Sequence, residues 1–259
     1  MKLTVVGCAG SFPGPTSAAS CYLLEAPDEA GRVWRVLLDL GSGALGPLQR
    51  YLAPDQIDAV LLSHLHPDHC VDLCGLYVAL RYNPAGPAAG KLPVYGPADT
   101  SARLAALYGG EEGNDLAEVF DVREWQPGEA IRIGPFSVVP RRVDHPVEAY
   151  GMRIERRTPA RTAVLAYSGD TDSCPELITL AEGADILLAE AAFVEGRDTS
   201  RHVHLTGLRA GEVATQAGVK QLLLTHLPVW TDPVTTLAEA ATSFEGECRV
   251  VSAGDVYRI

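Results

Sequence analysis

The segment Ser63-His64-Leu65-His66-Pro67-Asp68-His69 places three histidines and one aspartate within six residues. Imidazole and carboxylate are side chains that bind a divalent, zinc-like ion at neutral pH, so this segment predicts a metal site. In an extended turn, His64 and His66 can point the same way. Asp68 and His69 begin the next predicted helix and can turn toward a second point nearby. One short loop could therefore serve two metal ions.

Three more candidate ligands stand apart from this segment, namely His145, Asp170 and His226. Each follows an apolar segment that has the length and composition of a buried strand. Open α/β sheets place their sites at the edge where the carboxyl ends of the strands lie. If these strands lie side by side, loops that are far apart in the sequence converge at that edge.

These residues need a scaffold in which strands and helices alternate, and the apolar patterns of the chain predict an α/β fold of this kind. The segment 108–115 is polar and rich in glycine, so we expect a surface loop that could serve as a lid. Strands are expected near residues 2–6, 22–25, 33–38, 59–62, 92–95, 131–133, 136–143, 149–154, 163–167, 186–189, 221–225 and 248–251. Helices are expected after residue 43 through residue 51 and near residues 68–80, 100–107, 175–181, 206–217 and 233–243.

Composition limits the choice of substrate. The chain has 259 residues and is 47% hydrophobic, which is enough to bury a sizeable core. It carries 21 Lys and Arg against 33 Asp and Glu, so its formal net charge is −12. A negative far field slows the approach of long polyanions such as tRNA. A small substrate, attracted locally by bound metal and a few arginines, is favoured.

The six cysteines are scattered without the spacing of a zinc ribbon or a secreted scaffold, which favours a reducing cytoplasm. The sequence Val5-Val6-Gly7-Cys8 looks like a lipoprotein cleavage site, but the apolar stretch before it is too short for a signal peptide. No run approaches the roughly 18 apolar residues that cross a bilayer. We therefore expect a cytoplasmic location and no membrane contact.

The combined pattern resembles the metallo-β-lactamase superfamily, because Asp39 in an Asp-Leu-Gly turn precedes the other candidates in the family order. The resemblance covers nearly the whole chain. It implies a single hydrolase domain over residues 1–259 with an αββα four-layer sandwich of two similar halves and a dinuclear site at one edge. By this resemblance, His64, His66 and His145 bind one ion, Asp68, His69 and His226 bind the other, and Asp170 bridges both.

The ions implied are divalent, and Zn²⁺ is expected, although histidine and carboxylate suit Mn²⁺ and Fe²⁺ as well. Many true lactamases of this fold carry a cysteine where Asp170 stands, so the aspartate argues against antibiotic hydrolysis. For Asp39 we favour a role in which its carboxylate hydrogen-bonds the metal-binding loop without contacting metal.

Two further matches are similar to ribonuclease Z-like phosphodiesterases. They are the sequence His204-Leu205-Thr206 and the upstream Glu190. The resemblance implies that His204 lies near the scissile phosphate and that Glu190 orients it. A carboxylate partner raises the pKa of an imidazole, so His204 could donate a proton to the departing oxygen. The catalytic set expected is Asp68, Glu190 and His204, while His202 is expected to be a surface neighbour.

The resemblance also narrows the function. Ribonuclease Z that processes tRNA usually has a long protruding arm, and no segment here has room for one. The chain looks closer to arm-less actinobacterial proteins of this group, which implies hydrolysis of a cyclic nucleotide, 3′,5′-cyclic AMP first of all, by a homodimer. Alternatives are an RNA 3′-end endonuclease, a glyoxalase II-like thioester hydrolase and a sensor that binds nucleotide without cleaving it. Tyr82 and Trp230 could stack a purine, but aromatic residues beside loops are usually core.

Overall fold

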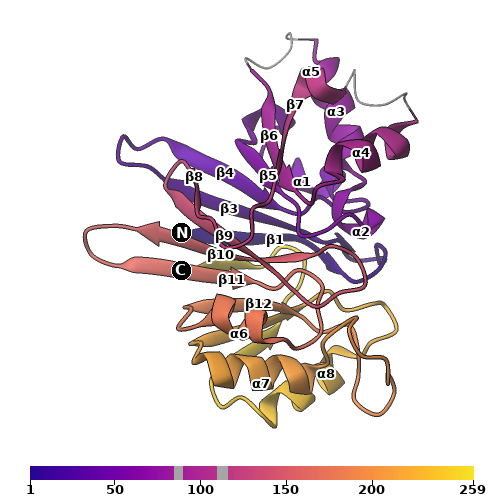
Figure 1. Ribbon diagram of the computed structural model, residues 1–259, viewed down its shortest axis with the longest axis vertical. Coiled ribbons are helices and arrows are strands. Elements are labelled where there is room, and N and C mark those ends of the chain that lie inside the picture. Colours follow the sequence, from indigo (N-terminus) through magenta and orange to yellow (C-terminus); the bar gives the residue numbers. More distant parts are fainter. Residues whose placement is uncertain (85–89, 110–115) are drawn as a thin grey trace.

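Two β-sheets face each other at the centre of the molecule, and helices cover the outer face of each sheet (Figure 1). The computed structural model describes residues 1–84, 90–109 and 116–259. Most of the segment 108–115, which the sequence predicts as a loop, lies outside these residues. Tyr108 is the last residue of a helix, and Gly109 caps it in the left-handed conformation.

The first sheet has the strand order β15-β1-β3-β4-β5-β6-β7, with β2 paired to β1. The strands from β4 to β7 pair in parallel, so their carboxyl ends share one edge of the sheet. The strands are β1 (Lys2–Ala9), β2 (Ala18–Ala19), β3 (Cys21–Pro27), β4 (Val33–Leu38), β5 (Ala59–Leu61), β6 (Leu92–Gly96), β7 (Phe120–Glu124) and β15 (Val256–Arg258). The helices of this half are α1 (Leu45–Leu48), the 3₁₀ helix η1 (Pro54–Gln56), α2 (Pro67–Cys70), α3 (Leu73–Arg81), α4 (Thr100–Tyr108) and α5 (Leu116–Val119).

The second sheet has the order β14-β13-β12-β11-β10-β9-β8. Here the strands from β11 to β14 pair in parallel, which repeats the arrangement of the first half. The strands are β8 (Ile131–Ile133), β9 (Phe136–Arg142), β10 (Tyr150–Arg157), β11 (Thr162–Tyr167), β12 (Ile186–Glu190), β13 (Gln221–Thr225) and β14 (Glu247–Val250). The helices are α6 (Pro175–Ala181), α7 (Gly207–Ala217) and α8 (Pro233–Ala241).

The core has three apolar layers, as a four-layer sandwich requires. Successive side chains of a strand point to opposite faces, so Val36 and Leu38 of β4 enter the layer between the sheets while Leu37 enters the layer under the helices. In the second half, Leu223 faces the other sheet, and Leu222 lies under the helices with Val213 of α7. The predicted αββα sandwich is confirmed.

Some elements differ from the sequence predictions. The helix predicted over 68–80 is two helices, α2 and α3, separated by Val71 and Asp72. The carboxylate of Asp72 accepts the backbone N–H groups of Gly43 and Leu45, which ties this break to the neighbouring loop. The edge strands β7 and β15 were missed because their polar, half-exposed sequences lack the apolar run of a central strand.

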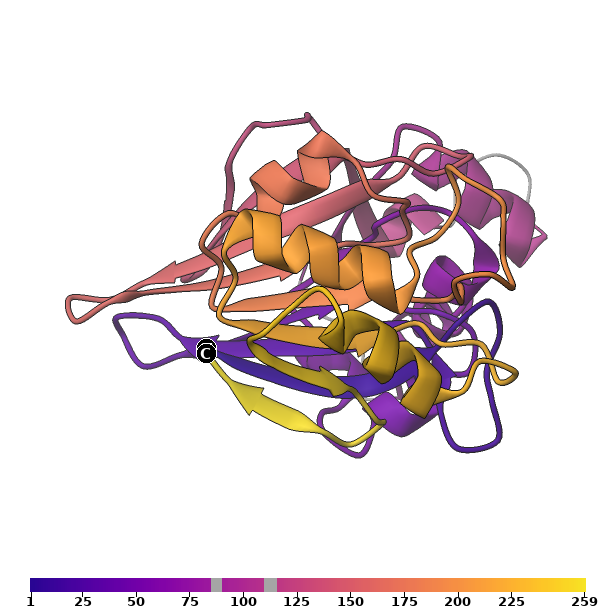
Figure 2. The same ribbon diagram turned by 90° about the horizontal axis from the view of Figure 1, so that it is seen from below.

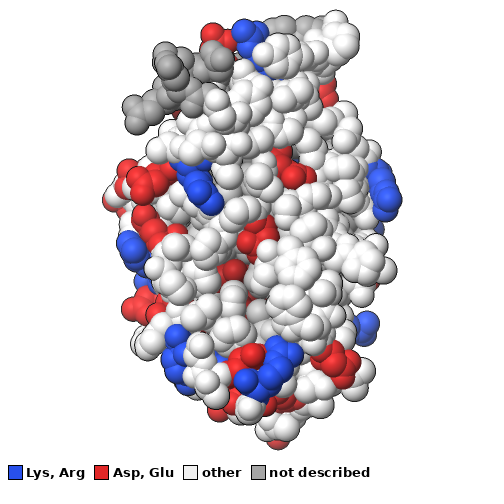
Figure 3. All heavy atoms as spheres, turned by 90° about the vertical axis from the view of Figure 1, so that its right-hand side faces the viewer, with Lys and Arg blue, Asp and Glu red and all other residues white. Residues whose placement is uncertain are grey.

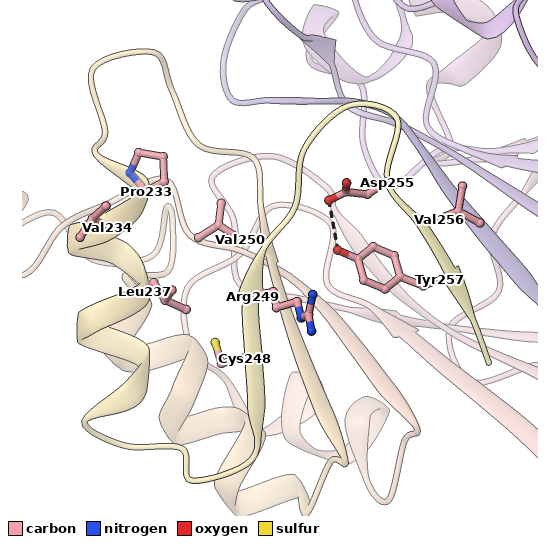
Figure 4. A pocket seen from close by; sticks show the side chains of 9 residues that line it. All are labelled: Pro233, Val234, Leu237, Cys248, Arg249, Val250, Asp255, Val256 and Tyr257. Atoms are coloured by element: carbon pink, nitrogen blue, oxygen red, sulfur yellow. Dashed lines mark hydrogen bonds between the residues drawn. The ribbon is translucent and has the colours of Figure 1, made fainter.

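The two termini lie side by side at one end of the sandwich, where the amino group of Met1 donates to the carbonyl of Ile259 at 3.0 Å (Figure 2). Near β14, β15 and α8 there is a cavity of about 440 Å³ that is lined by Leu237, Val250 and Tyr257 among others (Figure 4). None of the candidate metal ligands lines this cavity. In the described part of the chain, no helix has both the length and the apolar character needed to span a bilayer.

Candidate metal centre

Loops at the carboxyl edge of both sheets carry the candidate ligands. His64 comes shortly after β5, His145 after β9, Asp170 after β11 and His226 directly after β13. The remaining three come from the start of α2 (His66, Asp68 and His69). Viewed from this side, the molecule has a hollow with acidic residues on its floor, and Lys and Arg side chains stand in separate groups toward its rim (Figure 3). All seven predicted ligands converge, in two groups that share Asp170.

The first group is formed by His64, His66, His145 and Asp170. The Nε2 atom of His64 lies 3.0 Å from Nδ1 of His66 and 3.6 Å from Oδ2 of Asp170. His145 completes the group with its Nε2 atom 3.4 Å from Nδ1 of His66. On its other side, the Nδ1–H of His145 donates to the carbonyl of Val203 at 2.8 Å, which leaves Nε2 free to bind a cation.

The second group is formed by Asp68, His69, His226 and Asp170. The Nε2 atom of His69 lies 3.2 Å from Oδ1 of Asp170, 3.2 Å from Nε2 of His226 and 3.4 Å from Oδ2 of Asp68. The Nε2 atom of His226 lies 3.1 Å from the same Asp68 oxygen. Asp170 is shared by both groups: its Oδ1 atom lies near His69, and its Oδ2 atom lies 3.6 Å from Nε2 of His64 and 3.5 Å from Nε2 of His226.

The spacing of the donor atoms fits divalent ions. Zinc–nitrogen bonds of 2.0–2.1 Å in a tetrahedron place neighbouring donor atoms about 3.3 Å apart. The observed separations within the two groups scatter around that value. Burial is the largest influence on His64, His66 and His145 and lowers the pKa of each, so these imidazoles are neutral and able to bind metal.

The buried carboxylates of the second group favour a positive charge near them. Burial alone would lower the pKa of His69, but the carboxylates of Asp170 and Asp39 raise it well above its usual value. Burial alone would raise the pKa of Asp170, but the imidazoles of His226 and His69 hold it well below its usual value. A cluster of buried carboxylates stabilises a cation, and a divalent ion supplies that charge more fully than a protonated histidine.

Asp39 supports the ligands from behind. One of its carboxylate oxygens, Oδ2, accepts the Nδ1–H of His69 at 2.8 Å, the hydroxyl of Ser63 at 2.8 Å and the hydroxyl of Tyr167 at 2.6 Å. The other oxygen accepts the backbone N–H of Ser63 at 2.7 Å. The bond to His69 turns its Nε2 toward the second group. The expectation that Asp39 hydrogen-bonds the metal loop agrees with these contacts.

Backbone strain is concentrated in these loops. In the described ranges, the non-glycine residues with positive φ are Ser11 (64°), Asp39 (57°), His202 (65°) and His226 (58°). Such conformations cost free energy and persist where the surrounding structure holds them, often at functional sites. Close packing adds to the constraint, because a Cβ atom on Gly41 would lie only 1.8 Å from the carbonyl oxygen of Asp68.

Glu190 and His204 form a pair beside the two groups. Oε1 of the buried Glu190 accepts the Nδ1–H of His204 at 2.8 Å and the N–H of Thr171 at 3.0 Å, and Oε2 accepts the N–H of Ala192. Burial alone would lower the pKa of His204, but the Glu190 carboxylate, followed by Asp170, raises it to about 9. Glu190 therefore favours the doubly protonated, cationic form of the His204 imidazole, and one donor atom each of Glu190, His204 and His226 lie within 4.8 Å of one another.

The loop that carries His204 is held by residues that were not predicted from the sequence. The buried carboxylate of Asp172 accepts Arg209 Nη1 at 2.5 Å, Arg201 Nε at 2.6 Å and the backbone N–H of His202 at 2.9 Å. Arg209 also donates to the carbonyl of His204 at 3.1 Å. The Asp170-Thr171-Asp172 sequence was the available signal, since a second carboxylate two residues from a ligand suggests a supporting contact.

Three side chains at the rim were also interpreted from the sequence. The side chain of His202 is 79% exposed and pairs with Asp144, so its surface position is confirmed. The core positions favoured for Tyr82 and Trp230 are wrong, because Tyr82 is 64% exposed and Trp230 is 59% exposed. Tyr82 ends α3 on the surface, and Trp230 lies in the loop after His226.

A four-layer sandwich with a cluster of imidazoles and carboxylates at its loop-bearing edge is the arrangement of a metal-dependent hydrolase. A model of the family described as "Beta-lactamase superfamily domain" matches residues 34–227. The chain belongs to this superfamily.

Several proteins are similar to this chain over most of its length. An uncharacterized protein of Mycobacterium leprae is 47% identical over 262 residues, covering 100% of this chain and 89% of the relative. The probable metallo-hydrolase YhfI of Bacillus subtilis is 33% identical and covers 99% of both chains. The crystal structure of YhfI matches with a TM-score of 0.85 over 99% of this chain and 98% of that one. A ribonuclease Z of Ligilactobacillus salivarius is 26% identical, covering 88% of this chain and 86% of the relative.

Proposed function

We propose that this chain is a dinuclear metal-dependent phosphodiesterase that hydrolyses a small cyclic phosphodiester, with 3′,5′-cyclic AMP as the leading candidate. The observation that carries the proposal is the Glu190–His204 pair beside the two groups of candidate ligands. A metal cluster alone would serve many hydrolytic reactions. A buried carboxylate that keeps an adjacent imidazole protonated adds a proton donor, which the departing alkoxide of a phosphodiester needs.

In this proposal, His64, His66 and His145 would hold one ion, Asp68, His69 and His226 would hold the second, and Asp170 would contribute to both. Bound divalent ions supply Lewis acidity for the phosphoryl oxygens and lower the pKa of water enough to provide a nucleophile. Zn²⁺ is expected. The proposal takes the chain as one domain that acts as a homodimer in the cytoplasm.

The chain's own residues prepare the remaining steps. The Nδ1–H of His204 is engaged by Glu190, so Nε2 is the atom that can donate a proton to the leaving oxygen. Asp39 keeps the Nε2 atom of His69 directed at the second group, and the carbonyl of Val203 does the same for His145. Because His145 donates to the carbonyl of Val203, the residue before His204, this contact links the loop that carries the proton donor to the first group of ligands. Positioning of this kind contributes to rate because the reacting groups are already oriented.

A ribonuclease is the second candidate, and the similarity to the ribonuclease Z of Ligilactobacillus salivarius favours it. The same site could cleave an RNA phosphodiester bond. The net charge of −12 disfavours a long polyanion, because electrostatic attraction contributes much of the affinity for nucleic acid. In the described part of the face in Figure 3, Lys and Arg side chains form separate groups instead of a continuous band across the hollow. Both observations favour the small diester.

The test is a panel of substrates assayed with metal-replete protein: 3′,5′-cyclic AMP, 3′,5′-cyclic GMP, 2′,3′-cyclic nucleotides, a precursor tRNA and a thioester. The proposal expects hydrolysis of a cyclic nucleotide at a higher kcat/KM than of the tRNA. With His204→Ala, turnover of the diester should fall on the order of 10²-fold through loss of the general acid. A thioesterase would barely change. Cyclic nucleotides left untouched by wild-type protein, or cyclic AMP bound without product, would rule the proposal out.

A further inference from the structure

An exposed aromatic pair lies beside the candidate metal centre. The rings of Phe12 and Trp230 have centroids 5.2 Å apart and are tilted by 47°. Trp230 remains 59% exposed and Phe12 39% exposed in spite of this contact, and the neighbouring Val229 is 53% exposed. Apolar side chains gathered on a surface in this way are typical of a binding site. Neither aromatic residue contributes to the three core layers.

The pair is attached to the second group of ligands through the backbone. The N–H of Ser11 lies 3.3 Å from Nε2 of His226, and Phe12 is the next residue. Consecutive Cα atoms are about 3.8 Å apart, so Phe12 begins close to the candidate ligand. Trp230 follows His226 by four residues, in a turn that is closed by the N–H of Thr231 donating to the carbonyl of Pro228 at 2.8 Å.

Two loops hold the pair in place. The N–H of Gly10 donates to the carbonyl of Leu227 at 3.1 Å, and a Cβ atom on Gly10 would lie 2.3 Å from the carbonyl oxygen of His226. Arg197 holds the loop after β13, since its Nη2 atom donates to Oγ1 of Thr231 at 3.1 Å. The loops after β1 and β13 run side by side at the site-bearing edge (Figure 2). The aromatic surface is therefore preorganised, which reduces the entropy lost on binding.

We propose that Phe12 and Trp230 form a stacking platform for the nucleobase of a nucleotide whose phosphate is held at the metal centre. The inference rests on the proposed function for the position of the phosphate. In a nucleotide, the base lies one sugar ring away from the phosphate, so an exposed aromatic ring next to the ligands, and not among them, is where a base would rest. An aromatic ring stacks on any base because every base has a π-face, and each stacked base contributes about 1–3 kcal/mol to affinity.

The platform is tested by titrating adenosine 5′-monophosphate into the metal-replete protein and following tryptophan fluorescence. The chain has three tryptophans, and Trp125 is only 1% exposed while Trp34 packs against Arg32 in the β3–β4 hairpin. We expect saturable quenching in the wild type, no such quenching in Trp230→Phe, and an affinity roughly 5- to 150-fold weaker in Phe12→Ala. Ribose 5-phosphate, which has no base, should not quench.

Tyr82→Ala is the control, because Tyr82 is an exposed aromatic residue like Trp230, at 64% against 59%, but packs on Tyr77 of α3 and not on the Phe12–Trp230 pair. It should leave the affinity for the nucleotide unchanged. An absence of saturable quenching, or the same affinity in Phe12→Ala as in the wild type, would overturn the platform. Hydrolysis measured on the same wild-type protein keeps the two proposals apart: quenching without hydrolysis of any diester removes the phosphodiesterase and keeps the platform, and the reverse result removes only the platform.

Discussion

The substitution Glu190→Gln should change how activity depends on pH far more than it changes activity at low pH. In the proposed reaction, His204 acts in its protonated form, so activity is present below its pKa and is lost as the pH rises through it. The Glu190 carboxylate is the largest influence that raises this pKa, to about 9 from an ordinary value of 6.5. Removal of that negative charge lowers the pKa, and the loss of activity moves to lower pH.

The expected change in activity follows from the size of the pKa shift of His204. The His204 side chain is only 13% exposed, and a shift of this size corresponds to about 3 kcal/mol between the two protonation states. If the pKa falls the whole way back to 6.5, the protonated fraction drops roughly 80-fold at about pH 8.5 but only about 1.3-fold at about pH 6. These values are upper limits, because Asp170 also raises the pKa and remains in the variant, and because divalent ions bound nearby lower the pKa of His204 in both proteins.

The assay is the initial rate of cyclic AMP hydrolysis by metal-replete protein from about pH 6 to pH 9, with thermal unfolding measured on the same samples. Unfolding is included because the glutamine must still pair with the N–H groups of Thr171 and Ala192. Glu195→Gln is the matched control: its carboxylate accepts the hydroxyl of Thr206 and does not contact His204. The reasoning would be refuted if Glu190→Gln lost activity at the same alkaline pH as the wild type, or if this pH shifted equally in Glu195→Gln.

Two more substitutions test the support of the site. Asp39→Asn removes the charged acceptor of His69 and should weaken binding of one metal ion 10- to 100-fold, measured by competition with a chelator; unchanged affinity at both sites would contradict the supporting role. Asp172→Ala leaves the buried guanidinium of Arg209 with Glu195 as its remaining carboxylate partner and should lower the free energy of unfolding by up to about 3–5 kcal/mol, measured by denaturant titration. A loss below about 1 kcal/mol would contradict this role for Asp172, because Glu195 or water would then be enough to compensate the charge of Arg209.

Periodicity and ligand chemistry made much of this molecule predictable. The strands β4 and β13 begin and end where the apolar pattern placed them, because strands inside a sheet have apolar side chains on both faces and their sequences form nearly continuous apolar runs. The ligands could be found for a similar reason. Few roles other than metal binding bring His64, His66, Asp68 and His69 so close together, and parallel strands bring the later ligands to the same edge.

The parts that were missed depend on contacts between distant segments. The edge strands β7 and β15 have mixed polar sequences, so only pairing with β6 and β1 identifies them as strands. The role of Asp172 depends on Arg209, which lies 37 residues away in another element. Trp230 packs against Phe12, which lies near the start of the chain. Contacts between residues so far apart in the chain cannot be predicted from the local sequence.

The most direct test of the proposed metal centre is to measure how many metal ions each chain binds. Elemental analysis of the metal-replete wild type, His145→Ala and His226→Ala should find about two divalent ions per chain in the wild type and about one in each variant, since each substitution removes a ligand from a different group. Each variant should also remain folded by circular dichroism. A wild-type protein that holds no transition ion, or variants that retain the full wild-type complement, would contradict the claim that these loops bind a pair of metal ions.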